Sequence, residues 1–216
     1  MVTVMTKAKT GSKHLPAEQR RAATVNAVLE LAARQNPGEI TTSAIAREMN
    51  LTQGALFRHF PNKEAIWQAV MSWVAEQLLK RVEKAARDAP TPLAALESMF
   101  MTHIAFVVAH PGIPRMLFSE LQHHRKSPAK NLARTLVQRY RQKLADLIEA
   151  GKNSGQVAPE VEPDSAAVLF VGMIQGLVVQ SLLAGDPEQM KVNAPGVFDL
   201  FKRGIVNRPT AEETRS

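Results

Sequence analysis

The sequence contains no cysteine, and only 5% of its residues are aromatic. Without cysteine the chain cannot form disulfides, thiol redox switches or cysteine-ligated metal sites. It also lacks any long run in which apolar and polar residues alternate, the pattern of a half-buried strand. Because helix-forming residues dominate what remains, we expect an all-α fold.

A second group of absences concerns catalysis and export. No nucleophile elbow, phosphate-binding glycine loop or pair of catalytic carboxylates is present, so we predict that the protein is not an enzyme and uses no cofactor. The first residues, MVTVMTKAKTGSKH, are basic and polar and lack the continuous apolar segment of a secretory signal. We expect a flexible arm at residues 1–14 and a cytoplasmic, nucleoid-associated protein.

Three potential metal ligands, Glu120, His123 and His124, lie close together in the sequence. Adjacent histidines point to different sides of a helix, and no two histidines stand four residues apart with a carboxylate nearby. We predict no metal site and interpret this segment as the solvated basic end of a helix.

Positive charge is concentrated at the N-terminal end of the chain. The 216 residues carry a net charge of +7, of which residues 1–63, with nine basic and four acidic residues, contribute +5. A basic excess confined to one end indicates an anionic partner, and nucleic acid is the commonest. On charge alone, a merely solvated surface explains the excess equally well.

The stretch TTSAIAREMNLTQGALFRHF contains two short helical patterns, at 42–49 and 53–60, separated by three residues. Asn50 tolerates the left-handed conformation that ends a helix, Leu51 supplies an apolar anchor, and Thr52 can cap the next helix. With an earlier helix at 16–34, this arrangement is typical of a helix-turn-helix, whose second helix enters the DNA major groove.

The second helix of this motif carries residues suited to reading DNA. Gly54 and Ala55 have almost no side chain, which lets the backbone approach a surface closely. Gln53 can present its amide to an adenine edge, while Arg58, His59 and Lys63 supply charge for phosphates. A plain helical hairpin, with a glycine for tight packing, is the structural alternative.

The run IAREMNLTQGALFRHFPNK resembles the DNA-binding domain of the tetracycline-repressor (TetR) family of transcriptional regulators, over about residues 16–70. The resemblance implies that Thr42, Ser43, Gln53, Gly54 and Ala55 lie in or near the groove and that His59 and Lys63 contact phosphates. It also implies a variable helical domain for ligand binding and dimerisation. Two positions depart from the family pattern, which usually has Gly where Asn50 stands and Tyr where Phe57 stands. Because phenylalanine lacks the hydroxyl with which that tyrosine contacts a phosphate, one contact is missing, and Arg58 can offset its loss. The DNA-binding residues expected from pattern and resemblance together are Thr42, Ser43, Thr52, Gln53, Gly54, Ala55, Phe57, Arg58, His59 and Lys63.

We therefore expect a helix-turn-helix domain at 15–62, a larger helical domain for effector binding and dimerisation at 63–206, and a frayed tail at 207–216. Helices are predicted from 63 to just before Pro90, and at 93–109, 113–124 and 131–150, the last ended by Gly151. A further helix covers the segment from Ala166, and a short one follows Pro195.

The segment AAVLFVGMIQGLVVQSLLA is apolar around its whole circumference and long enough to raise the question of a membrane span. Two glutamines, a serine and two glycines interrupt it, and acidic residues flank it, so we expect no membrane association. A helix without a polar face must be covered on both sides. We predict a homodimer that buries Gly176, Val179, Leu183, Phe198 and Phe201.

Soft, adaptable side chains on the helices of the larger domain suggest a cavity for an apolar or amphipathic effector. The candidates are Met99, His103, Phe106, Met116, Phe170, Met173 and Gln175. Ordinary core packing explains any one of them equally well. Two functions remain: a regulator, taken to be a repressor, that a small molecule releases from a palindromic site on double-stranded DNA, or an effector-independent architectural or protein-interaction factor that also binds DNA.

Overall fold

The computed structural model describes residues 17–122 and 127–207, and within these ranges the chain is helical apart from turns and an isolated antiparallel bridge between Val157 and Val206. This confirms the all-α prediction. The elements are α1 (Ala17–Arg34), the 3₁₀ turn η1 (Pro37–Glu39), α2 (Thr42–Glu48), α3 (Gln53–Phe57), α4 (Lys63–Arg87), α5 (Pro92–Ala109), α6 (Gly112–Gln122), α7 (Pro128–Asn153), α8 (Pro163–Ala184) and α9 (Gln189–Ile205).

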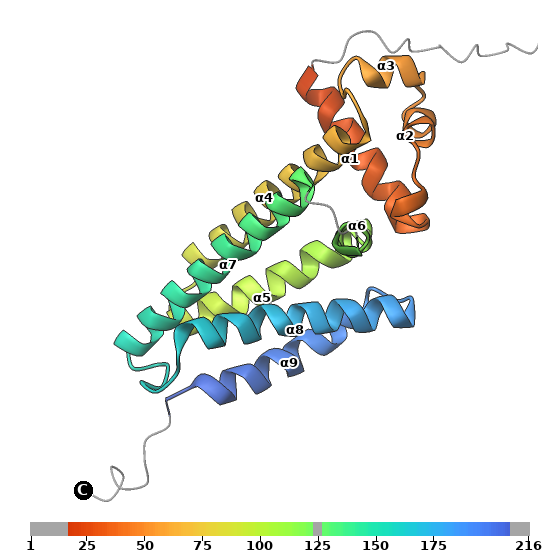
Figure 1. The fold of residues 1–216 in the computed structure, drawn as a ribbon. Helices are drawn as coiled ribbons and strands as arrows, with labels where there is room; N and C mark the ends of the chain where they lie inside the picture. The colour runs from red at the N-terminus through yellow and green to blue at the C-terminus, as the bar shows by residue number, and fades with distance from the viewer. Residues whose placement is uncertain (1–16, 123–126, 208–216) are drawn as a thin grey trace, which may run out of the picture.

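Helices α1, α2 and α3 form a small head at one end of the elongated molecule, and α4 runs from this head into the larger part (Figure 1). The head has its own core, in which Val28, Ile45, Leu56 and Phe60 are at most 1% exposed. Helix α3 ends at Phe57, three residues earlier than expected, because the backbone tightens into a turn in which the His59 N–H donates to the Leu56 carbonyl.

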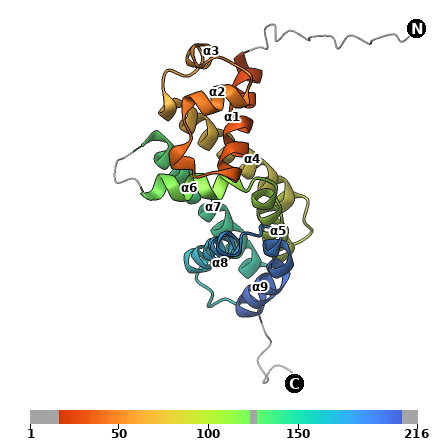
Figure 2. The same cartoon turned by 90° about the vertical axis from the view of Figure 1, so that its right-hand side faces the viewer.

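The larger part consists of α4 to α9. Helix α4 packs against α5 and α7, α7 packs against α8, and α9 covers α5 and α8 on the side away from the head (Figures 1 and 2). Its centre is an aromatic cluster from three helices. The ring of Phe170 lies 5.3 Å from that of Phe100, 6.5 Å from Phe198 and 5.7 Å from Phe201, centroid to centroid.

Two predicted boundaries in this part are wrong. Gly151 does not end a helix but lies inside α7, where it allows close packing: a Cβ at this position would be 2.6 Å from Cγ2 of Val157. Pro195 does not precede the last helix but lies within α9, which begins at Gln189. Proline is tolerated there because it is on the exposed side, where water can satisfy the backbone carbonyl that loses its N–H partner.

Two helices, α5 and α8, are long and apolar enough by composition to cross a membrane. Helix α5 is packed between α4, α7 and α9, and α8 between α7 and α9. The apolarity of α5 and of the inward face of α8 therefore follows from their packing inside the larger domain and does not indicate a membrane protein.

Candidate DNA-reading surface and effector cavity

The turn between α2 and α3 has the predicted geometry. Asn50 adopts a positive φ of 55°, and the Leu51 N–H donates to the Ala46 carbonyl at 2.8 Å, which closes the end of α2. Thr52 then caps α3 by accepting a hydrogen bond from the Ala55 N–H at 3.2 Å. Asparagine thus replaces glycine in the left-handed conformation without loss of the helix-ending turn.

The Gln53 amide is held in place by the helix before it. Its Nε2 donates to Oγ1 of Thr42 at 2.7 Å, and the Ser43 hydroxyl donates to its Oε1 at 3.1 Å. One N–H and one oxygen lone pair remain, which is the combination that pairs with the N7 and N6 groups of adenine. A Cβ on Gly54 would meet nothing within 4 Å, so the start of α3 presents bare backbone to its surroundings.

The cationic side chains around this surface differ in their exposure and in their contacts with other residues. The side chains of Arg47 and Arg58 are exposed. His59 is half-buried, with its Nε2 3.4 Å from Arg20. The Lys63 ammonium donates to the Gly38 carbonyl at 3.3 Å and lies 4.8 Å from the centre of the Trp67 ring, and partial burial lowers its pKa.

The remaining predicted positions fit the same surface. Thr52 is exposed, Ala55 is half-buried, and Phe57 is 41% exposed although it is aromatic. The ten predicted residues are thus brought together on and around α3, at the end of the molecule farthest from α9 (Figure 2). The basic arm, with Lys7, Lys9 and Lys13, lies outside the described residues.

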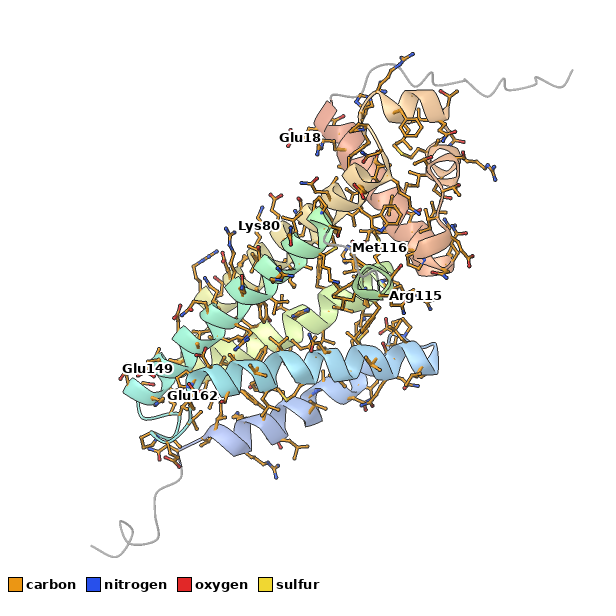
Figure 3. All side chains as sticks on the ribbon, viewed as in Figure 1. Glu18, Lys80, Arg115, Met116, Glu149 and Glu162 are labelled. Carbon is orange, nitrogen blue, oxygen red and sulfur yellow. The ribbon has the colours of Figure 1, made fainter. Side chains whose placement is uncertain are left out.

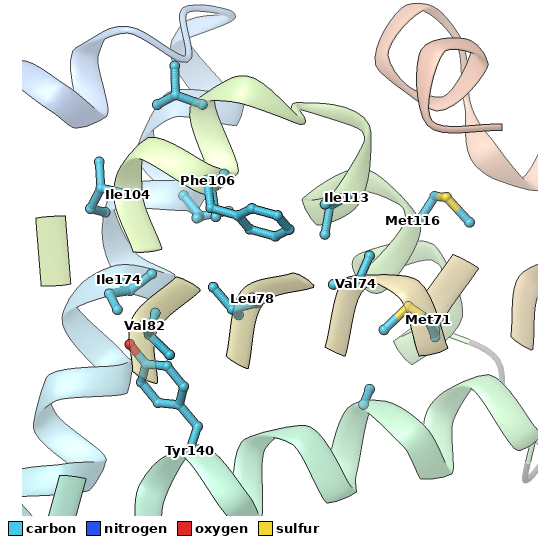
Figure 4. Packing of buried hydrophobic residues seen from close by; sticks show 14 of the residues in the cluster. Met71, Val74, Leu78, Val82, Ile104, Phe106, Ile113, Met116, Tyr140 and Ile174 are labelled. Atoms are coloured by element: carbon cyan, nitrogen blue, oxygen red, sulfur yellow. The ribbon is translucent and has the colours of Figure 1, made fainter. Parts of the chain in front are cut away.

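A cavity of about 650 Å³ that is open to solvent on one side lies in the larger domain and is lined by residues of five helices. Figure 4 shows Val74 and Leu78 of α4, Phe106 of α5 and Ile113 of α6 pointing toward one another, and all four line the cavity. The lining residues are Met71, Val74, Leu78, His103, Phe106, Val107, Ile113, Pro114, Leu117, Phe118, Leu121, Ala133, Leu136, Val137, Tyr140, Val171, Ile174, Gln175, Gly176, Val178, Val179 and Gln180. The volume is typical of a pocket for a small organic ligand.

Three of the seven predicted effector residues line this cavity: His103, Phe106 and Gln175. The other four do not, which corrects their placement. Met99, Met116 and Phe170 are at most 2% exposed and fill the closed core, while Met173 packs against that core from the side. Helical periodicity identifies a buried face but does not tell a filled core from the wall of a cavity.

Sequence reasoning identified His103 but missed its polar partner in the cavity wall, Tyr140. The hydroxyl of Tyr140, the only tyrosine in the chain, lies 3.3 Å from Nδ1 of His103, and the two rings meet edge to face. Burial lowers the pKa of His103 to about 4 and raises the pKa of Tyr140, so both side chains are neutral at physiological pH. A single tyrosine within the apolar stripe of α7 was the available signal.

Helices α8 and α9 carry exposed apolar side chains on the side that no other part of the described chain covers. Of the predicted interface residues, Leu183 is 84% exposed, while Val179, 42% exposed, and Gly176, half-buried, also line the cavity. Phe198 and Phe201 correct the prediction, because they are at most 3% exposed and belong to the protomer's own aromatic cluster. The exposed apolar residues of α9 are Val192 and Leu200.

No group of three or more histidine, aspartate and glutamate side chains is placed to hold a metal ion anywhere in the described part of the chain. Glu120 is 8% exposed and accepts a hydrogen bond from the Ser127 hydroxyl, at the junction of α6 and α7. His123 and His124 lie outside the described residues.

Comparison with known proteins matches two family models to this chain. Residues 25–70 match the model of bacterial regulatory proteins of the tetR family, and residues 119–196 match the tetracyclin repressor-like C-terminal domain. The nucleoid occlusion factor SlmA of Aliivibrio fischeri is 22% identical over 146 residues, which cover 68% of this chain and 74% of that protein.

Solved structures share the fold over most of the chain. The fatty acid degradation regulator FadR from Bacillus halodurans superposes with a TM-score of 0.78 at 16% identity, covering 91% of this chain and 100% of that one. The native NalD structure, described as the secondary repressor of the MexAB-OprM multidrug efflux pump in Pseudomonas aeruginosa, gives a TM-score of 0.67 at 22% identity, covering 90% and 99%.

Proposed function

Because this chain belongs to the tetR family of bacterial regulatory proteins, we propose that it is a homodimeric repressor that a small apolar or amphipathic molecule releases from a palindromic operator. Family membership makes it a DNA-binding transcription regulator and not an enzyme. The observation that carries the rest of the proposal is the cavity, because two of the helices that line it also contact the DNA-reading head.

The proposed DNA contacts are of two kinds: contacts to base edges, which read the sequence, and contacts to phosphates, which position the protein. Gln53, preoriented by Thr42 and Ser43, reads a base edge, and the bare backbone at Gly54 lets α3 enter the major groove. Arg58 and Lys63 neutralise phosphates on either side. Lys63 must exchange its bond to the neutral Gly38 carbonyl for a phosphate oxygen, which gives the ammonium a charged partner.

The proposed dimer uses the exposed apolar faces of α8 and α9. Leu169 and Leu183 on α8, with Val192 and Leu200 on α9, are each more than half exposed in a single protomer. A second copy that packs its own α8 and α9 on these faces removes them from water, which drives association. The twofold axis then presents two heads to half-sites about 34–36 Å apart.

The route from cavity to head runs through α4 and α6. Helix α4 packs against α1 near its start and lines the cavity further on, at Met71, Val74 and Leu78. Helix α6, marked by Arg115 and Met116 in Figure 3, lies between the head and the cavity. Its first residue, Gly112, packs so closely on α1 that a Cβ there would be 2.2 Å from the Leu29 carbonyl oxygen.

A ligand that displaces α6 or α4 therefore moves the head of each protomer, and in a dimer it changes the spacing of the two α3 helices. The turn His110-Pro111-Gly112 between α5 and α6 is our proposed place where the displacement is absorbed. Turning a mostly binding-competent population into a mostly incompetent one requires up to about 10⁴-fold tighter ligand binding to the incompetent state.

The direct test is a gel shift with DNA that flanks the protein's own gene, compared with random DNA of equal length. We expect preferential binding of the flanking DNA and a footprint with two symmetric halves about one helical turn apart. Screening small molecules against this complex by fluorescence anisotropy should then identify compounds that release the DNA. Equal affinity for both DNAs would refute sequence-specific regulation.

A second candidate is a DNA-binding factor without a small-molecule effector, which acts through architecture or protein contacts on the nucleoid. It is favoured by the similarity to proteins named nucleoid occlusion factors. A cavity of about 650 Å³ is unnecessary for that role. Comparison of the parent with a cavity-filling variant such as Ala133→Phe separates the two candidates. A regulator loses the release of DNA by its ligand in the variant, whereas an architectural factor behaves the same in both proteins.

A further inference from the structure

The polar groups of the cavity are few and unequally placed. His103 and Tyr140 form a hydrogen-bonded pair, with the Tyr140 hydroxyl 3.3 Å from Nδ1 of His103. The two other polar side chains of the lining, Gln175 and Gln180, are exposed on α8 and belong to the open side of the cavity. The His103–Tyr140 pair is thus the principal hydrogen-bonding group of the enclosed part.

The hydrogen-bonding capacity of this pair does not depend on the histidine tautomer. If Tyr140 donates to Nδ1, its oxygen still accepts and the Nε2–H of His103 still donates. If Nδ1–H donates to Tyr140, the hydroxyl proton is free to donate and Nε2 accepts. In both cases the pair offers one donor and one acceptor, and the complementary partner is a hydroxyl group, which is also both.

Charge narrows the class of ligand further. Among the described residues that line the cavity there is no aspartate, glutamate, lysine or arginine. Arg81 on α4 lies over the ring of Phe106, 5.0 Å from its centroid, but it is exposed and does not line the cavity. A carboxylate or phosphate bound beside Tyr140 would be desolvated without an ionic partner, which is strongly unfavourable.

We propose that the effector is an uncharged, mainly apolar molecule whose hydroxyl group binds between His103 and Tyr140. The name effector rests on the proposed function, but the binding itself does not, because it can be measured without DNA. The apolar walls formed by Leu78, Phe106 and Ile113 hold the rest of the molecule.

The protein contains a natural reporter of this site. Trp73 on α4 contacts the wall of the cavity from behind: its ring lies 6.3 Å from that of Phe106 and 5.4 Å from that of His110. The chain has two tryptophans, and the other, Trp67, lies at the start of α4, where its ring is 4.8 Å from the Lys63 ammonium. In a Trp67→Phe background, fluorescence therefore reports on the cavity wall alone.

The experiment titrates this background variant with 1-decanol and with decanoate at neutral pH, two probes that share a ten-carbon chain and differ in charge. We expect a saturable fluorescence change with 1-decanol and at least tenfold weaker binding of decanoate. Decanoyl-CoA serves as a second anionic probe with the same acyl chain. Equal or tighter binding of either anion, or no saturable change with 1-decanol, would overturn the inference.

Two variants locate the hydroxyl. Tyr140→Phe keeps the ring and removes the hydroxyl, and we expect roughly tenfold weaker binding of 1-decanol, because His103 and the ligand lose their shared partner. Gln138→Leu is the control, since it removes an exposed amide from the same helix at a position that does not line the cavity, and it should change the affinity less than about twofold. Thermal unfolding of both variants verifies that they are folded. If Tyr140→Phe binds 1-decanol as tightly as the parent, the hydroxyl is not bound where we place it.

Addition of operator DNA separates this inference from the proposed function. If 1-decanol binds but leaves the protein–DNA complex intact, the ligand class stands and ligand-controlled release fails. If an anionic probe releases the DNA and 1-decanol does not, ligand-controlled release stands and the ligand class is wrong.

Discussion

Replacing Gly112 with alanine tests the contact by which the cavity communicates with the head. A Cβ at this position would lie 2.2 Å from the Leu29 carbonyl oxygen, about 1 Å closer than real contacts allow. The atom it meets is backbone and cannot rotate away. Overpacking of this kind costs about 2 kcal/mol, or roughly 4–8 °C in Tm for a domain of this size. Because Gly112 is the first residue of α6, better helix propensity offsets little of that cost.

Thermal unfolding and operator binding, measured with and without 1-decanol, give the two readouts. The response is the ratio of the operator affinity without 1-decanol to the operator affinity with it. We expect this ratio to fall about tenfold, toward unity, in Gly112→Ala, because α6 no longer packs closely on α1. The matched control is Gly151→Ala, which also forces a Cβ into a close contact, 2.6 Å from Val157, but far from the head. It should lose stability and keep its response. A Gly112→Ala protein as stable as the parent, or equally responsive, would refute the reasoning.

Three further predictions concern other parts of the molecule. Gln53→Ala should relax base preference at one or two positions by about 1–3 kcal/mol, whereas Lys63→Ala should weaken binding to all sequences and flatten its salt dependence, as gel shifts at several salt concentrations will measure. Leu183→Glu should yield monomers in sedimentation, because it places a charge on the proposed dimer face without altering the cavity. The stability of the parent should fall between pH 6.5 and pH 4 by on the order of 3 kcal/mol through His103, as urea unfolding will measure.

The sign of the pH effect follows from the direction of the shift. The His103 pKa is lower in the folded protein than in the unfolded chain, so the unfolded chain binds the extra proton first as pH falls. Full stability is present above pH 6.5, and the loss is complete near pH 4. His103→Gln removes this contribution. If the free energy of unfolding of that variant falls as steeply between pH 6.5 and 4 as that of the parent, the loss belongs to other groups.

The control for the dimer variant Leu183→Glu is Leu121→Glu on α6, which also places a charge on an exposed leucine and should stay dimeric.

The head was largely predictable from sequence because its signals are local. Thr41, Thr52 and Asn62 cap α2, α3 and α4 through their side chains, and each is a residue type that selects a helix start. Asn50 ends α2 in the left-handed conformation. Each of these signals acts within four residues of the turn it sets, so no knowledge of tertiary packing was needed.

The larger domain was less predictable because its decisive facts are relations between helices. The sequence pattern places Phe198 on a buried face but does not say whether that face meets its own core or a second protomer. Nor does it distinguish Met99, which fills the core, from His103 one turn later, which lines the cavity. Gly151 resembles a helix stop unless the close approach of Val157 is known.

The aromatic cluster also dictates an order of events during synthesis. Helix α9 contributes Phe198 and Phe201, which pack on Phe170 of the preceding helix α8 and on Phe100 of α5, which is made much earlier. The head needs only its own nearby helices and can fold while translation continues. The larger domain remains open, with the apolar surfaces of α5 and α8 unsheltered, until α9 has left the ribosome. A chain that terminates before α9 should therefore have a folded head and an aggregation-prone larger domain that depends on chaperones, and it should not act as a partly active regulator.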